Sequence, residues 1–333
     1  MKKFSLFLTA LLAFNLNAFA QDHSVTIGDI PPANKIEKVL SAGNPSDVLL
    51  LAVAPEKMAG TAGFDMQSKR AALFPEEQQK LPMLGKIAGK GSTLSAEKIV
   101  ALQPQLIVDV GNVGANYQAQ AKRTFEQTQV PYLLLDGKLS NTPHVLRSLG
   151  KLLGSNNAEQ QAQYAEQTLA QAEQFAKSHK AQTFFVARNA DGLQSGQTGS
   201  IHTETLEILG LKNVVEGDVQ SLAQVSMEQL LLWQPDFIFS QYDQFAQNVA
   251  QNAQWQGLSA VKNHKVFVFP TLPFGWLDSP PSLNRLLGVR WLQHQLEGKS
   301  AVDFVSEIQH FYKLFYHIDL SAEQAQELLP KNL

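Results

Sequence analysis

Short, continuous apolar runs recur along the chain and alternate with stretches whose apolar residues are spaced as in amphipathic helices. Apolar runs without polar alternation are typical of parallel strands that are covered by helices on both faces. The predicted strands are residues 47–53, 106–110, 132–135, 184–187, 237–239 and 266–269. Helical patterns lie between them, for example at residues 96–102, 143–153 and 227–233. The pattern therefore predicts an α/β fold with doubly wound parallel sheets.

One segment in the middle of the chain breaks this alternation. Residues 156–179 contain no Gly or Pro and are rich in Ala, Gln and Glu, which favour or tolerate a helix. A helix of this length spans about 36 Å, as long as a small domain is wide. We expect it to be a rigid connector between two lobes; the alternative is a surface helix of one larger domain.

A sequence repeat lies on either side of this segment. Residues 95–108 read SAEKIVALQPQLIV, and residues 226–239 read SMEQLLLWQPDFIF. Both copies predict a short helix, a turn closed by proline and a buried strand, because proline stops a helix and fixes the turn that follows it. One copy in each predicted lobe favours a duplicated, two-lobed architecture.

The N-terminus has the three parts of a secretory signal peptide. Met1-Lys2-Lys3 is followed by an apolar run at residues 4–14 and by the small-residue cleavage pattern Ala18-Phe19-Ala20. The run is shorter than the roughly 20 residues that span a bilayer. We therefore expect an exported, periplasmic protein. The predicted divisions are a signal peptide at 1–20, an N-terminal lobe at 21–153, a connecting helix at 154–180 and a C-terminal lobe at 181–333.

The composition excludes several classes of protein. The chain has no cysteine, which rules out disulfides, thiolate metal sites and a lipid anchor on an N-terminal Cys. A net charge of -3 gives no basic surface for nucleic acid. The G-x-S-x-G and H-E-x-x-H motifs are absent, and the glycine-rich residues 85–92 lack the spacing of a phosphate-binding loop. An enzyme is therefore not expected, and neither is a cofactor.

The repeated segments resemble the two matching motifs of periplasmic binding proteins for iron-siderophores and cobalamin, the helix-linked (class III) family that serves ABC importers. The resemblance continues at residues 54–58 (APEKM), 81–85 (LPMLG) and 258–263 (LSAVKN), and covers about residues 36–320. It implies two α/β lobes joined by one long helix, with the ligand held in the cleft between them. It also implies that Glu97 and Glu228 dock on arginines of a membrane permease. The alternative is that both are solvated acids favoured by a helix dipole.

Ligands of open α/β sheets bind outside the carboxyl ends of the strands. Asn112 and Tyr117 follow the strand at residues 106–110, and Tyr242 follows the strand at 237–239 in the matching place. We expect the two tyrosines to be opposite walls of the cleft, although a tyrosine there can also cap the core.

Three further candidates come from the C-terminal half. Arg188 follows the strand at 184–187 and offers a forked donor set for carboxylate, catecholate or oxyanion groups. His202 lies beside a predicted helix start, where free amides favour an anion, although a lone histidine is more often a structural hydrogen-bonding residue. Trp276, in a loop rich in Gly and Pro, is predicted to stack on a flat ligand or to close the cleft.

Ligand identity stays open. Catecholate sites of the family gather several cations, whereas these loops offer Arg188 and little else that is basic. The expected cargo is a metal complex of the iron-siderophore type; the alternatives are molybdate or tungstate, a nickel or cobalt chelate, or a periplasmic sensor with no transport role. The eight histidines are scattered, so capture of a bare divalent ion is not expected.

Overall fold

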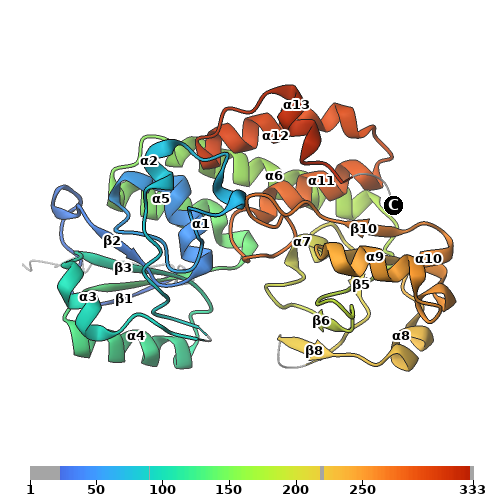
Figure 1. Ribbon diagram of the computed structural model, residues 1–333, viewed down its shortest axis with the longest axis horizontal. Helices are drawn as coiled ribbons and strands as arrows, with labels where there is room; N and C mark the ends of the chain where they lie inside the picture. The colour runs from blue at the N-terminus through green and yellow to red at the C-terminus, as the bar shows by residue number, and fades with distance from the viewer. Residues whose placement is uncertain (1–22, 90, 218–220, 331–333) are drawn as a thin grey trace, which may run out of the picture.

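Two α/β lobes lie side by side beneath a shared layer of helices (Figure 1). This computed structural model describes residues 23–89, 91–217 and 221–330. The predicted signal peptide at 1–20 lies outside these ranges. Within them, no helix has the length and apolarity needed to cross a membrane.

The N-terminal lobe is built on a four-stranded sheet with the order β1-β4-β3-β2. Strands β2, β3 and β4 are parallel, and β1 pairs antiparallel with β4. The strands are β1 (Ser24–Ile27), β2 (Val39–Ser41), β3 (Leu106–Gly111) and β4 (Tyr132–Asp136). The helices are α1 (Asn44–Val53), α2 (Glu76–Gln79), α3 (Ala96–Leu102), α4 (Ala115–Thr128) and α5 (Thr142–Leu153).

The strand predicted at residues 47–53 is wrong, because these residues form most of helix α1. Pro45 lies in the first turn of this helix, where its missing N–H costs no hydrogen bond. Residues 48–53 are apolar and all buried, so no polar residue interrupts this run on any side of the helix. A helix buried all round cannot be distinguished from a buried strand by periodicity.

The C-terminal lobe is built on a parallel sheet with the order β10-β9-β5-β7, and a two-stranded antiparallel sheet joins β6 to β8. The strands are β5 (Thr183–Val186), β6 (Gln194–Gly196), β7 (Lys212–Asn213), β8 (Leu222–Gln224), β9 (Phe237–Ser240) and β10 (Val266–Val268). The helices are α7 (Glu204–Glu207), α8 (Met227–Trp233), α9 (Asp243–Gln251), α10 (Ser259–Lys262), α11 (Arg285–Leu296), α12 (Val305–Phe311) and α13 (Ala322–Glu327).

Both main sheets are apolar on both faces, as the continuous runs predicted. In β3, Leu106 and Val108 pack into the main core beneath the helical layer, whereas Ile107 packs into a separate core on the opposite face. In β9, Phe237 and Ile238 divide in the same way between two cores. This division follows from the two-residue period of a strand.

The long helix is α6 (Ala158–Ser178), close to the predicted 156–179. It runs across both lobes with α11, α12 and α13 (Figure 1). Its small residues Ala162, Ala165 and Ala172 are fully buried. The Gln161 side chain donates hydrogen bonds to the carbonyls of Ala52 (2.8 Å) and Leu314 (2.9 Å), which ties α6 to α1 and to the C-terminal segment. The main core is continuous from one lobe to the other through this layer.

The sequence repeat has one local structure in both copies. Helices α3 and α8 have seven residues each, and each begins at a serine whose hydroxyl accepts a backbone N–H from the first turn. Each ends at a glutamine in the left-handed conformation, with φ of 52° at Gln103 and 45° at Gln234. Strands β3 and β9 follow directly. The two lobes therefore carry the same helix–turn–strand unit.

The junction of α5 and α6 makes a stability prediction. A Cβ added at Gly150 would lie 2.0 Å from the Cβ of Ala158. We expect Gly150→Ala to lower the free energy of unfolding by about 1–2 kcal/mol, because overpacking outweighs the gain in helix propensity. Urea denaturation measures the change.

The matched control is Gly111→Ala, where an added Cβ meets no atom within 4 Å. Its free energy of unfolding should stay within about 0.5 kcal/mol of the wild-type value. An equal effect of both substitutions would contradict close packing of α5 on α6.

Candidate functional site

A buried arginine joins the two lobes at their junction. Arg285, in the first turn of α11, is 1% exposed. Its guanidinium donates to the carbonyl of Gly137 in the N-terminal lobe (2.6 Å), and to the carbonyl of Ile201 (3.0 Å) and the carboxylate of Glu204 (2.6 Å) in the C-terminal lobe. Glu204 also accepts the backbone N–H of Leu139 (2.9 Å). These bonds place the loop around His202 against the N-terminal lobe.

A cavity of about 20 Å³ lies at this junction, with room for about one water molecule. Its lining comes from both lobes and includes Leu49, Val110, Lys138, Ser282 and Arg285. We regard it as part of the floor between the lobes, because it is too small for a chelate or an oxyanion.

Next to the junction, one buried carboxylate gathers three side chains. Asp278 lies between β10 and α11, and its side chain is 0% exposed. It accepts hydrogen bonds from Arg188 Nη1, from Gln241 Nε2 and from His202 Nδ1, the last at 2.6 Å. We call these four residues the Asp278 cluster. Burial alone would raise the pKa of Asp278, but the hydrogen bond from His202 and the charge of Arg188 hold it below its usual value. The group is therefore a carboxylate at neutral pH.

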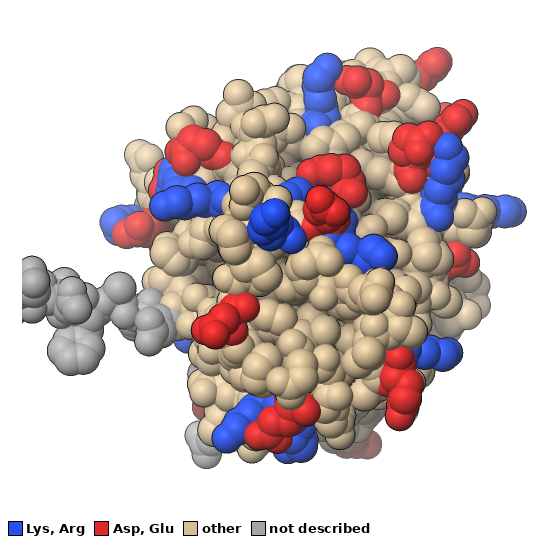
Figure 2. Space-filling view, turned by 90° about the vertical axis from the view of Figure 1, so that its left-hand side faces the viewer, with Lys and Arg blue, Asp and Glu red and all other residues tan. Residues whose placement is uncertain are grey.

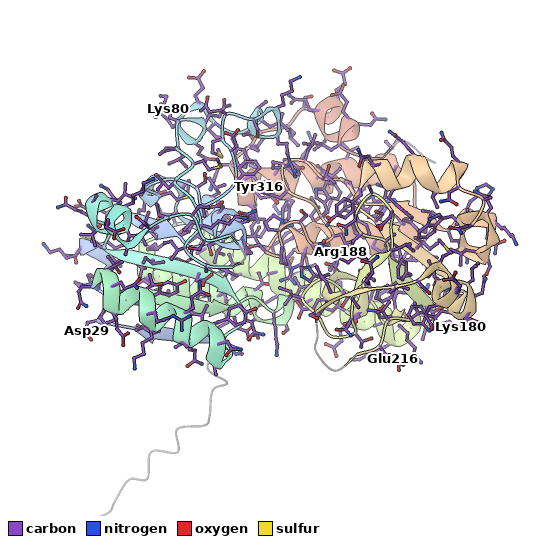
Figure 3. All side chains as sticks on the ribbon, turned by 60° about the horizontal axis from the view of Figure 1, so that its bottom comes forward. Asp29, Lys80, Lys180, Arg188, Glu216 and Tyr316 are labelled. Carbon is purple, nitrogen blue, oxygen red and sulfur yellow. The ribbon has the colours of Figure 1, made fainter. Side chains whose placement is uncertain are left out.

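The cluster lies at the carboxyl ends of parallel strands, where ligands of such sheets bind. Arg188 follows β5, and Gln241 follows β9. Figure 3 shows Arg188 near the middle of the molecule, at the border between the lobes. Its guanidinium lies 6.0 Å from the centre of the Tyr242 ring. The structure therefore brings three predicted site residues together: Arg188, His202 and Tyr242.

The cluster also has nitrogen atoms without a hydrogen-bond partner inside it. Arg188 Nε is buried and has no hydrogen-bond partner among the described residues. The His202 side chain is 22% exposed, and its Nδ1 is committed to Asp278. A carboxylate accepts and does not donate, so Nδ1 carries a proton, and Nε2 is the ring nitrogen left for a ligand.

The N-terminal lobe contributes less defined candidates. Asn112 is exposed, and its side-chain oxygen accepts the N–H of Gly114 (2.7 Å), which shapes the turn into α4. Tyr117 is 44% exposed in the first turn of that helix. The described contacts do not connect either residue to the Asp278 cluster.

The prediction for Trp276 is wrong. Its side chain is 0% exposed and packs in the main core, with its ring 6.4 Å from that of Phe304. The loop folds back on itself, because Gly275 N–H bonds to the carbonyl of Ser279 (2.7 Å). Trp276 is therefore a core residue and not a lid or a stacking surface.

The backbone amides of two loops, including the helix start expected to bind an anion beside His202, already have internal partners. The carboxyl group of Asp47 accepts the N–H groups of Ala62, Gly63 and Phe64 at 2.6, 3.0 and 3.1 Å. Glu207 accepts the N–H of Gly199 beside the start of α7 (3.1 Å). Burial raises the pKa of both carboxyl groups, with the amide bonds opposing it. Neither loop offers these amides to an anion.

Asp278 and Gln241 were not predicted from the sequence. Gln241 precedes Tyr242 in a candidate loop, but an uncharged amide in a loop carries no sequence signal of its own. Asp278 is 90 residues from Arg188, so only the fold shows that they pair. Among the described residues, no group of three or more His, Cys, Asp or Glu side chains is arranged to hold a metal ion.

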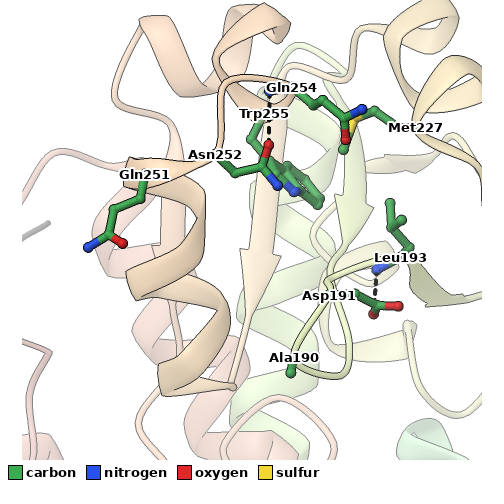
Figure 4. A pocket seen from close by; sticks show the side chains of 8 residues that line it. All are labelled: Ala190, Asp191, Leu193, Met227, Gln251, Asn252, Gln254 and Trp255. Atoms are coloured by element: carbon green, nitrogen blue, oxygen red, sulfur yellow. Dashed lines mark hydrogen bonds between the residues drawn. The ribbon is translucent and has the colours of Figure 1, made fainter.

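A more voluminous cavity lies elsewhere, on the C-terminal lobe beside α9 (Figure 4). It has a volume of about 510 Å³ and is open to solvent on one side. Its lining residues are Ala190, Asp191, Leu193, Met227, Gln251, Asn252, Gln254 and Trp255. Among the described residues, Asp191 is the one charged residue in this lining, and no member of the Asp278 cluster belongs to it. We favour the lobe junction because its polar groups converge.

The two predicted docking acids, Glu97 and Glu228, occupy the same position in the two copies of the repeat. Both are exposed in the first turn of their helices. The residue's own backbone N–H and the capping serine lower the pKa of each carboxyl below its usual range. Both are therefore fully charged at neutral pH. Figure 2 shows the N-terminal-lobe end of the molecule, where basic and acidic side chains are interspersed and form no field of one sign.

Solved structures with the same fold are binding proteins. An ABC transporter solute binding protein from Sulfurospirillum deleyianum has a TM-score of 0.78 at 26% identity, covering 88% of this chain and 94% of that chain. Molybdate-bound MolA of Haemophilus influenzae has a TM-score of 0.68 at 18% identity, covering 88% and 96%.

Sequence relatives agree with this result. The chain is 28% identical to the molybdate-binding protein MolA over 125 residues, 36% of this chain and 35% of MolA. It therefore matches only about a third of the length of that relative. It is 26% identical to a vitamin B12-binding protein of Pectobacterium atrosepticum over 207 residues, 58% of this chain and 71% of that protein.

The family model described as periplasmic binding protein matches residues 43–271. This match covers well over half of the chain, and the matched proteins are solute-binding proteins rather than enzymes. The protein belongs to the periplasmic binding protein family, among the members whose two α/β lobes are joined by one long helix.

Proposed function

We propose that the protein is the periplasmic substrate-binding component of an ABC importer, which captures a compact metal complex or an oxyanion between its lobes and delivers it to a membrane permease. The observation that carries this proposal is the similarity to an ABC transporter solute binding protein over 88% of the chain. Export through a signal peptide at residues 1–20 is part of the proposal.

The ligand would lie against the Asp278 cluster. Arg188, His202 and Tyr242 supply a charged group, a ring nitrogen and an aromatic face at one place on the C-terminal lobe. Asn112 and Tyr117 are the proposed contacts from the N-terminal lobe. Relatives that bind molybdate and vitamin B12 support both cargo classes, and a structural neighbour from Helicobacter pylori was solved with a nickel–histidine complex. An iron-siderophore remains a third candidate.

The lobe junction limits how the lobes move. The shared core and the bonds of Arg285 to both lobes resist a wide hinge. We infer that closure over the ligand is small, so the permease would recognise the protein through its surface carboxylates and a modest change in lobe orientation. Charged groups on rigid helices orient a partner and speed encounter.

A thermal-shift screen tests the cargo. The chain without residues 1–20 is mixed with molybdate, tungstate, cobalamin, nickel–histidine or a ferric siderophore, with sulfate as the control for oxyanion charge and shape. A ligand at a hundred times its Kd stabilises the folded state by about 2.7 kcal/mol, which raises Tm by several degrees. We expect one class to do so. No shift with any of the five would contradict the proposed cargo.

Reversal of the two docking charges tests the delivery step. We expect Glu97→Lys with Glu228→Lys to abolish uptake in proteoliposomes that contain the permease, because like charges would then face each other. Ligand affinity should not change, since both residues lie on surface helices.

The matched control is Glu76→Lys with Glu323→Lys, which reverses two exposed first-turn acids outside the repeat. It should transport like the wild type. Loss of ligand affinity in the Glu97 and Glu228 variant would show that the docking surface is misplaced. Ligand binding without uptake in the wild type would favour the sensor.

A further inference from the structure

We propose that Asp278 is a specificity-determining residue, which cancels the charge of Arg188 and adapts the cleft to ligands of little or no net negative charge. The chemical class is a neutral or singly charged metal chelate rather than a free dianion such as molybdate. This inference rests on the proposed function and selects between its cargo classes.

The first support is the direct pairing of the two charges. Asp278 is fully buried, and Arg188 is 8% exposed. The ion pair joins Arg188 Nη1 to Asp278 Oδ2, and the same oxygen accepts from His202. One positive and one negative charge therefore meet in a place that water hardly reaches, so screening by solvent is weak. A ligand at this wall meets a neutral pair and not a free cation.

The second support is that Asp278 is held in place. Its other oxygen accepts from Gln241 Nε2, while Gln241 Oε1 lies 3.4 Å from the backbone N of Asp278. Gly275 leaves space for this amide, because an added Cβ would lie 2.4 Å from Gln241 Oε1. With both carboxylate oxygens bonded, Asp278 is not free to turn away and expose Arg188 when an anion arrives.

The third support is that acidic side chains also pair with other hydrogen-bond donors near the lobe junction. Glu204 neutralises Arg285, Glu207 occupies the amide of Gly199, and Asp47 occupies three amides of residues 62–64. Each of these donors is therefore already paired with an internal acid. A site built for a dianion would leave such donors free.

The N-terminal lobe adds a limited positive charge. Lys138 lines the small junction cavity, and Lys86 has its Cε close to Gly63, where an added Cβ would lie 2.8 Å away. These lysines allow a ligand with a small negative charge. They do not change the charge balance between Arg188 and Asp278 on the C-terminal lobe.

The test compares ligands of different charge on the same variant. We measure Kd by isothermal titration calorimetry at pH 7 and low salt for molybdate and for nickel–histidine. Asp278→Asn keeps the shape of the side chain and leaves Arg188 uncompensated. We expect it to bind molybdate at least about tenfold more tightly than the wild type, with a smaller gain at high salt. Its affinity for nickel–histidine should be equal or lower.

A purely structural role would give a different result, because loosening the cluster weakens both ligands together. Equal losses for molybdate and nickel–histidine would therefore overturn the inference. Binding of neither probe to the wild type, with no gain of molybdate binding in Asp278→Asn, would overturn this inference. The proposed function would then rest on cobalamin or the ferric siderophore, which the thermal-shift screen tests separately.

Asp278→Asn leaves the buried charge of Arg188 unpaired, which can prevent folding. A second pair of variants covers this case. Arg188→Gln alone leaves the Asp278 charge, whereas Arg188→Gln with Asp278→Asn restores neutrality. We expect the double variant to bind molybdate about tenfold more tightly than Arg188→Gln. Equal molybdate affinities of these two variants would overturn the inference. Circular dichroism and Tm confirm that each variant is folded.

Discussion

The burial of charge at the lobe junction is the constraint on which the rest of the structure depends. Arg285 is fully buried where the two lobes meet, and a buried cation is tolerated only when acceptors surround it. It finds them in both lobes: the carbonyl of Gly137 on one side, and the carbonyl of Ile201 and the carboxylate of Glu204 on the other. Satisfying this one group fixes the α7 segment, the start of α11 and the end of β4 relative to one another.

That arrangement explains why the site is both rigid and shared. The loop that holds His202 is anchored through Ile201, and Thr205 bonds to the carbonyl of Leu277 beside Asp278 (2.7 Å). The Asp278 cluster is thus supported by the same contacts that join the lobes. A core that continues through α6 and α11 adds to this stiffness. We infer that ligand recognition relies on a preorganised wall, because a wide domain closure would break the junction.

Much of the fold follows from the sequence, and the exceptions have clear causes. Five of the six predicted strands match β3, β4, β5, β9 and β10, because continuous apolar runs flanked by turns carry that information. The sixth is α1, a helix buried on all sides, and strands of two to four residues such as β7 and β8 leave too short a pattern to detect. In the candidate site, strand ends indicated Arg188 and Tyr242, and a predicted helix start indicated His202. Asp278 pairs with Arg188, which is 90 residues away in the sequence. Trp276 is buried in the core because its loop folds back on itself. Local sequence patterns contain neither piece of information.

The most direct test of the central claim is a crystal structure of the chain without residues 1–20, bound to molybdate or to nickel–histidine, whichever gives the larger thermal shift. Anomalous scattering locates molybdenum or nickel without ambiguity. The account predicts the metal between the lobes, against Tyr242 and His202, with the Arg188–Asp278 ion pair intact. A metal in the cavity beside Trp255, or one between the lobes with Arg188 pulled away from Asp278, would contradict it.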